Sequence, residues 1–166
     1  MKKFLLVLAV VFGLSTTAMA QQKGDAFIGG AIGFSAGTDS ATSFGLAVEG
    51  GFVANRLALS GEVAYNLVAG EINVITVGPK LSYYARLADK FYYTPGVSVV
   101  GAYVNVGGAD TGNIGVGLDL AAFEFRPTQH FGMKVNLFSM SAMFNNGFSF
   151  SADMMMNTSV SFRYYF

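Results

Sequence analysis

Few side chains in this chain of 166 residues could perform acid–base or nucleophilic chemistry. There is no cysteine, and the one histidine, His130, follows the turn-forming stretch 126–129 (RPTQ). Hydrolases and acyltransferases require a base beside the group that it activates. No His, Cys and Asp residues have the spacing of a metal site, and the stretches GFSAGT and GGADTG resemble exposed loops more than phosphate-binding loops. We therefore predict a non-enzymatic protein without a cofactor.

Eight charged residues are instead spaced so that they could neutralise one another. Four acids and four bases lie in segments that otherwise consist of apolar and small residues. Buried charges need partners, and equal numbers allow every charge to be paired. Arg163, for example, could pair with a carboxylate such as Glu49 or Glu62. The predicted network of internal ion pairs consists of Glu49, Glu62, Lys80, Arg86, Asp119, Glu124, Lys134 and Arg163.

Eight segments with a period of two must position these charges. In each segment, large apolar residues alternate with smaller or polar ones, which is the pattern of a β-strand with two different faces. Turn-forming residues separate the segments. The predicted strands span 25–35, 43–54, 57–68, 73–87, 91–104, 113–125, 130–141 and 149–166.

Three positions depart from a regular strand pattern. Strict alternation from Ile114 would place Glu124 on the apolar face, and a β-bulge near residues 121–122 would return it to the polar face. Pro79 and Pro95 lack the N–H that a central strand donates. We interpret both prolines as bulge positions.

The first twenty residues have the features of a secretory signal peptide. Lys2 and Lys3 precede the apolar stretch 4–14, and residues 18–20 form a small-x-small cleavage site. We therefore predict a signal peptide at 1–20 and one domain at 21–166. The loss of Lys2 and Lys3 leaves eight basic and ten acidic residues, a net charge of −2 that does not favour a nucleic-acid partner.

The composition of the chain is typical of a membrane protein. Hydrophobic residues make up 52% of it and charged residues only 12%, with a mean hydropathy of +0.47. After residue 20, however, no apolar run approaches the roughly 18 residues of a transmembrane helix. Only helices and closed barrels satisfy the backbone inside lipid. The all-β fold class predicted is therefore an eight-stranded antiparallel up-and-down transmembrane β-barrel. A secreted β-sandwich is the soluble alternative, but its water-facing side would normally carry more Lys and Glu.

Three stretches resemble a known family. Residues 77–103 contain a Gly-Pro, a Tyr-Tyr pair, a short turn and a glycine-rich strand in that order, and residues 51–65 have the form of a first hairpin. With the terminal aromatic residues Phe162, Tyr164 and Phe166, the mature chain resembles the small outer-membrane β-barrels of Gram-negative bacteria, the OmpA/OmpX-type and porin-like barrel domains. The resemblance implies a location in the outer membrane, contact with its lipids, and recognition of the three aromatic residues by the outer-membrane assembly machinery.

Two roles follow from a lumen of this size. Eight strands leave an interior just wide enough for side chains to fill, which favours a structural or general envelope role. A narrow channel, or a binder of small solutes or apolar molecules, is the alternative. Outer-membrane barrels have short periplasmic turns and longer outer loops. We therefore expect the segments near 36–42, 69–73, 105–112 and 142–148 outside, and the turns near 54–57, 87–90 and 126–129 in the periplasm with both termini.

Overall fold

A computed structural model describes residues 25–35, 43–68, 72–144 and 148–166 of the protein. The predicted signal peptide, 1–20, lies outside these residues, and its boundary with the domain stays a prediction. No helix in the described ranges is long and apolar enough to cross a membrane. The regular elements there are the strands β1 (Asp25–Ser35), β2 (Ser43–Ala54), β3 (Leu57–Val68), β4 (Ile72–Tyr83), β5 (Ala85–Ala88), β6 (Phe91–Tyr93), β7 (Gly96–Val106), β8 (Ala109–Phe125), β9 (Phe131–Phe144) and β10 (Phe148–Tyr165).

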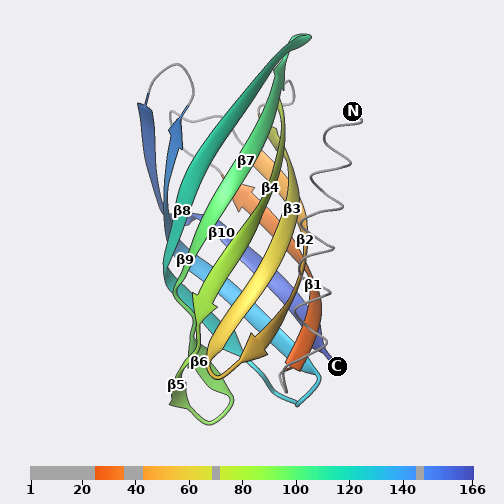
Figure 1. The fold of residues 1–166 in the computed structure, drawn as a ribbon, viewed down its shortest axis with the longest axis vertical. Coiled ribbons are helices and arrows are strands. Elements are labelled where there is room, and N and C mark those ends of the chain that lie inside the picture. The colour runs from red at the N-terminus through yellow and green to blue at the C-terminus, as the bar shows by residue number, and fades with distance from the viewer. Residues whose placement is uncertain (1–24, 36–42, 69–71, 145–147) are drawn as a thin grey trace.

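The strands form one closed antiparallel ring (Figure 1). Strand β5 continues β4 beyond Tyr84, and β7 continues β6 beyond residues 94–95, so the ring has eight staves. Each stave pairs with its neighbours in the chain, and β10 closes the ring by pairing with β1 from Phe27–Tyr165 to Ser35–Asn157. The predicted eight-stranded up-and-down barrel is confirmed.

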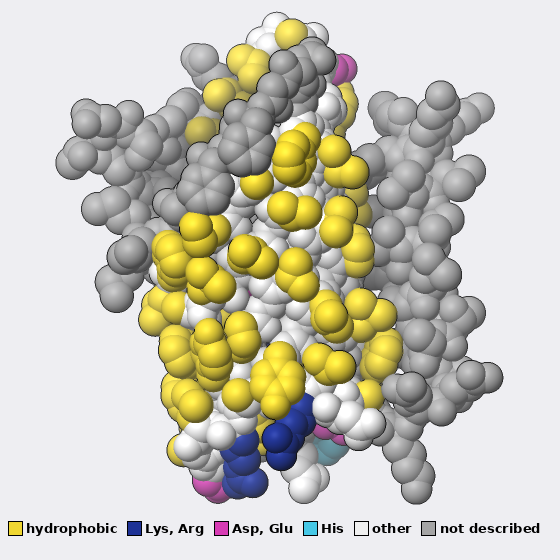
Figure 2. Space-filling model, turned by 60° about the vertical axis from the view of Figure 1, so that its left-hand side comes forward, with side chains coloured by type: hydrophobic (Ala, Val, Ile, Leu, Met, Phe, Trp, Pro, Cys, Tyr) yellow, Lys and Arg dark blue, Asp and Glu magenta, His cyan; other side chains and the backbone are white. Residues whose placement is uncertain are grey.

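Side chains alternate between the lumen and the outside of the ring. Figure 2 shows hydrophobic side chains spread over the barrel wall, with most of the charged ones at one end. Because eight staves enclose little space, large apolar side chains are turned outward and small ones inward. The exposed apolar residues include Ile28, Ile32, Leu46, Val48, Leu59, Val97, Val99, Val116 and Leu118.

The two ends of the barrel differ in their connections. At one end, called here the turn end, Asn55 and Arg56 form a two-residue turn with φ values of 49° and 71°, and residues 89–90 and 126–130 make the other turns. At the opposite end, the far end, we expected a loop over 105–112. That prediction is wrong, because β7 and β8 form a tight hairpin around Gly107 and Gly108, whose φ values of 56° and 90° suit a two-residue turn.

The backbone irregularities are not all where the prolines suggest. Pro79 pairs with Gly61 without a register shift, so its interpretation as a bulge is wrong. On its other side, the β4–β7 pairing is interrupted between Val77 and Lys80 and resumes in the same register. Pro95 lies in the break between β6 and β7, and the extra residue is in β8 opposite it. The register shifts in β8 fall between Asp119 and residues 121–122, where the alternation of Glu124 requires a bulge.

Candidate functional site: a charged cluster across the lumen

Arg163 is the centre of the most extensive polar cluster in the described lumen. Strand β10 turns its side chain inward, where it is buried. The guanidinium binds both oxygens of Glu49: Nε lies 2.5 Å from Oε1, and Nη2 lies 2.7 Å from Oε2. This two-point contact matches the planar fork of arginine to a carboxylate and is among the stronger hydrogen-bonded pairs that proteins form.

Arg163 has a glycine opposite it on each neighbouring strand. In the strand pairing, Arg163 lies opposite Gly29 on β1 and opposite Gly132 on β9, and Gly29 in turn lies opposite Glu49 on β2. A Cβ atom at Gly29 would lie 3.0 Å from the Arg163 Cγ and 3.2 Å from a Glu49 oxygen. A Cβ atom at Gly132 would lie 2.9 Å from a Glu124 oxygen. The space that a larger residue would fill on each neighbouring strand is therefore open to the arginine and its carboxylate partners.

Glu124 is the second carboxylate bound by Arg163. It is fully buried, and the β8 bulge turns it into the lumen. Its Oε2 accepts hydrogen bonds from Arg163 Nη1 at 2.7 Å and from the Tyr84 hydroxyl at 2.8 Å, while the Tyr165 hydroxyl donates to Oε1. Arg163 Nη1 also donates to the Tyr84 oxygen at 2.6 Å. The buried charge is therefore hydrogen-bonded on both oxygens, as burial requires.

Arg126 joins Glu124 from the turn end. Its Nε donates to Glu124 Oε1 at 2.6 Å, and its guanidinium lies 3.8 Å from the centre of the Tyr165 ring, a cation–π contact. Burial opposes the charge on Arg126, but Glu124, Tyr165 and Tyr84 together outweigh it, so the pKa of Arg126 lies above its ordinary value. Glu49, Tyr84, Glu124, Arg126, Arg163 and Tyr165 together form what we call the Arg163 cluster.

Sequence reasoning missed three members of this cluster. Tyr84 and Tyr165 carry a detectable signal, because each has the same parity in its strand as an inward residue, Ser82 and Arg163 respectively. Arg126 has no such signal, because it follows the last residue of β8 and alternation does not apply there.

A second group of charges lies beyond the Arg163 cluster, toward the far end. Lys80 contacts Asp119, and the Lys134 Nζ atom lies 4.0 Å from the same carboxylate. Asn136 Nδ2 donates to Asp119 Oδ1 at 2.8 Å. Lys80, Asp119, Lys134 and Asn136 form the Asp119 cluster. Glu62 lines the cavities around this cluster, so seven of the eight predicted network residues belong to the lumen.

Arg86 does not belong to the network. Its side chain is 64% exposed and donates to Asp89 at 2.6 Å in the β5–β6 turn. The prediction failed because alternation gives the side to which a residue points but not its height along the barrel. Arg86 lies in a hairpin that extends beyond the ring, so its side chain lies at the mouth of the barrel.

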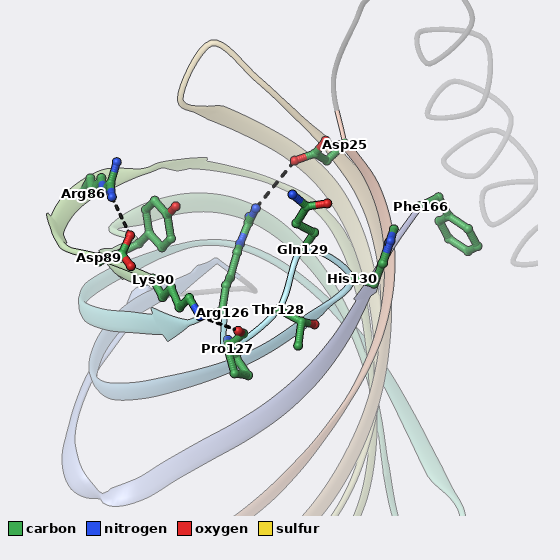
Figure 3. Close-up of a pocket in the computed structure, with 11 residues that line it drawn as sticks. Asp25, Arg86, Asp89, Lys90, Arg126, Pro127, Thr128, Gln129, His130 and Phe166 are labelled. Atoms are coloured by element: carbon green, nitrogen blue, oxygen red, sulfur yellow. Dashed lines mark hydrogen bonds and ion pairs between the residues drawn. The ribbon is translucent and has the colours of Figure 1, made fainter.

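The mouth at the turn end holds a cavity of about 780 Å³. Figure 3 shows Arg126 in its middle, reaching toward Asp25 at 3.7 Å, with Lys90 bonded to the Pro127 carbonyl at 3.0 Å. His130 lies on its wall, where Nδ1 is 2.9 Å from the backbone oxygen of Tyr165. The described residues contain no group of three His, Cys, Asp or Glu suited to hold a metal ion.

The three aromatic residues of the predicted assembly signal point away from the lumen. Phe162, Tyr164 and Phe166 are exposed on the outer face of β10 and at its end. The ring of Phe162 stacks on Phe131 at 6.1 Å between centroids, and Tyr164 stacks on His130 at 5.9 Å. Their recognition by assembly machinery stays a prediction.

Solved structures of small outer-membrane barrels are similar to this one. The structure is similar to neisserial surface protein A, with a TM-score of 0.59 and 15% identity over 86% of this chain and 97% of that one. The chain has the fold of the small outer-membrane β-barrels. The N-terminal β-barrel domain of Pseudomonas aeruginosa OprF also matches, with a TM-score of 0.49 and 12% identity over 87% of this chain and 100% of that one. No protein-family model matches the sequence, and no curated protein matches it.

Proposed function

We propose that this protein is an integral outer-membrane barrel with a closed lumen and a structural, non-catalytic role in the envelope. Its fold is that of outer-membrane barrels, and its exposed wall is apolar on staves all around the ring. Side chains such as Ile32, Val99 and Leu118 would be costly to expose to water in such numbers, but they suit the hydrocarbon of a bilayer.

The observation that carries the closed lumen is the set of staves that the Arg163 cluster joins. Glu49 comes from β2, Tyr84 from the junction of β4 and β5, Glu124 from β8, and Arg163 from β10. These staves lie around the whole ring, and their side chains meet through hydrogen bonds of 2.5–2.8 Å. A solute that passed through the barrel would have to separate these buried, fully paired charges, which is costly.

The non-catalytic role is supported by the interactions that already occupy each side chain that could act as a catalytic acid or base. The carboxylates Glu49 and Glu124 are held by arginines, and His130 contacts the end of the last strand. None of these groups lies beside a serine or threonine hydroxyl that it could activate in the described interactions. The lumen charges therefore serve to hold the staves together.

Conductance in planar bilayers tests the closed lumen. The purified, refolded protein is expected to give no discrete current steps. The double variant Glu49→Ala/Arg163→Ala is the matched positive control. It removes the two-point ion pair between Arg163 and Glu49 without changing the net charge, and it is expected to conduct ions. Stable, solute-selective steps in the parent protein would refute the closed lumen and would favour the narrow channel.

A further inference from the structure

Glu62 is the one lumen carboxylate that has no direct partner among the described residues. It lies opposite Glu49 on the neighbouring strand, and both oxygens of Glu49 are bound by Arg163. No described Lys or Arg nitrogen lies within 4.0 Å of Glu62, and it takes part in no described hydrogen bond. Glu62 is half-buried, and Lys80 and Lys134 act on its charge only from beyond ion-pair distance, so neither is a direct partner.

The space beside Glu62 is hollow. Cavities of about 170 Å³ and 180 Å³ share Glu62, Thr76 and Ser159 as lining residues. Each is large enough for several water molecules, each of which occupies about 30 Å³ of liquid. The space exists because the inward positions toward the far end carry small side chains, including Gly33, Gly45, Ala47 and Ala64.

The lining suits a short amine. The hydroxyls of Thr76 and Ser98 can accept hydrogen bonds from an ammonium group, which has three donors. The side chains of Ala64 and Val100 line the same spaces and would contact an alkyl group. Asp119, the other carboxylate on this wall, is bound to Lys80, so the cavity does not offer the several free oxygen ligands that Ca²⁺ or Mg²⁺ prefers. Two lysines also line the spaces around Glu62, and both pair with Asp119: Lys80 directly, and Lys134 at 4.0 Å.

The charge of the far end favours cations over anions. The described far-end residues 31–35, 43–48, 64–68, 72–79, 98–118 and 136–144 contain no Lys or Arg. Among them, Asp110 in the β7–β8 hairpin accepts hydrogen bonds from Tyr103 and Asn105, which lower its pKa and keep it charged at neutral pH. A carboxylate at an entrance raises the local concentration of cations there. The Arg163 cluster closes the other end of this space.

We infer that the far-end half of the lumen is a blind binding pocket for a small organic cation, an alkylammonium of a few heavy atoms whose charge pairs with Glu62. The pocket needs the barrel fold but not passage through it, so this inference stands apart from the conductance test. Loss of the ion pair at Glu62 should weaken binding about tenfold or more, because hydrogen bonds to charged groups are stronger than neutral ones.

The test is a titration of the isotopically labelled protein, refolded in detergent, followed by NMR. Ethylammonium chloride is the probe, and ethanol and sodium acetate at matched ionic strength are the neutral and anionic comparisons. We expect saturable shifts at Thr76, Ser98 and Ala64 with ethylammonium only. No saturable shift with ethylammonium, or equal shifts with ethanol, would overturn the inference.

Variants locate the site. Glu62→Gln should weaken ethylammonium binding at least tenfold, whereas Asp89→Asn, which removes the same charge at the turn end, should leave the affinity within twofold of the parent. Ala64→Leu fills the pocket without changing a charge and should abolish ethylammonium binding. It tests the pocket independently if Glu62→Gln does not fold. Parent-like affinity in either lumen variant would overturn the inference.

Discussion

Replacement of Arg163 by leucine tests whether the Arg163 cluster stabilises the barrel. The leucine side chain is apolar and of moderate size, so the change removes a charge without adding bulk to the lumen. It leaves Glu49 without the donors that bind both its oxygens at 2.5 and 2.7 Å. Glu124 is affected less, because Arg126 Nε remains 2.6 Å from it.

The expected loss of stability depends mainly on Glu49, because Glu124 keeps other partners. Removal of one partner from a buried ion pair costs about 3–5 kcal/mol, because the other charge stays buried and uncompensated. Most of that cost should come from Glu49, since Glu124 keeps Arg126, Tyr84 and Tyr165 as partners. The free energy of unfolding should therefore fall by about 3–5 kcal/mol in Arg163→Leu.

Double variants separate the two carboxylates. Glu49→Leu/Arg163→Leu removes both members of the pair and should recover most of the loss. Glu124→Leu/Arg163→Leu should not, because Glu49 remains unpaired and Arg126 loses its closest carboxylate. Arg86→Leu, which removes an exposed arginine from the β5–β6 turn, is the matched control, with an expected loss of about 0–1 kcal/mol.

The assay is urea unfolding in lipid vesicles, followed by far-ultraviolet circular dichroism and by the change in gel mobility between folded and unfolded barrel. The chain has no tryptophan, so intrinsic tryptophan fluorescence offers no signal. If Arg163→Leu unfolds at the same urea concentration as Arg86→Leu, the cluster does not stabilise the barrel. If Glu124→Leu rather than Glu49→Leu rescues Arg163→Leu, the assignment of the unpaired charge to Glu49 is wrong.

Three further predictions concern packing, topology and assembly. Gly29→Ala should lower the free energy of unfolding by about 1–3 kcal/mol, because its methyl group would lie 2.8 Å from a backbone oxygen, whereas Gly30→Ala, with its nearest atom at 3.7 Å, should be nearly neutral in the same urea assay. A cysteine at Ala109 in the β7–β8 hairpin should react with an impermeant thiol reagent on intact cells, and one at Asp89 should not; the reverse pattern would invert the proposed orientation. Deletion of Phe166 should reduce the amount of barrel in the outer-membrane fraction without lowering the urea midpoint of the barrel that does insert, and unchanged insertion would remove Phe166 from the assembly signal.

The direction of most side chains could be predicted from alternation alone. In a strand, parity decides between lumen and wall, and a slip of one residue would reverse every side chain. Parity correctly turned Glu49 and Lys134 inward and Phe162 outward. It also required a bulge for Glu124, and the register shifts of β8 fall at that point. These inferences succeeded because they depend only on neighbours in the chain.

Height along the barrel and choice of partner could not be predicted in this way. Arg86 has inward parity but lies in a hairpin beyond the ring, where water replaces the partners it was expected to have. The hairpin at Gly107–Gly108 was expected to be a loop because its residues are turn formers, although a pair of glycines also suits a tight two-residue turn. Both outcomes depend on where each stave ends relative to the others, which is set by pairing across the whole ring.

The choice of Glu49 rather than Glu62 as the partner of Arg163 shows how the staggered register selects contacts. Arg163, Gly29, Glu49 and Glu62 lie in one row across β10, β1, β2 and β3, each opposite the next. Because the second position in the row is glycine, the arginine can extend across β1 and bind the first carboxylate it meets, with both of that carboxylate's oxygens. Glu62, one strand farther, is left without a direct partner and lines the cavities toward the far end. The glycine that lets Arg163 reach Glu49 therefore also decides that Glu62 is the carboxylate without a direct partner.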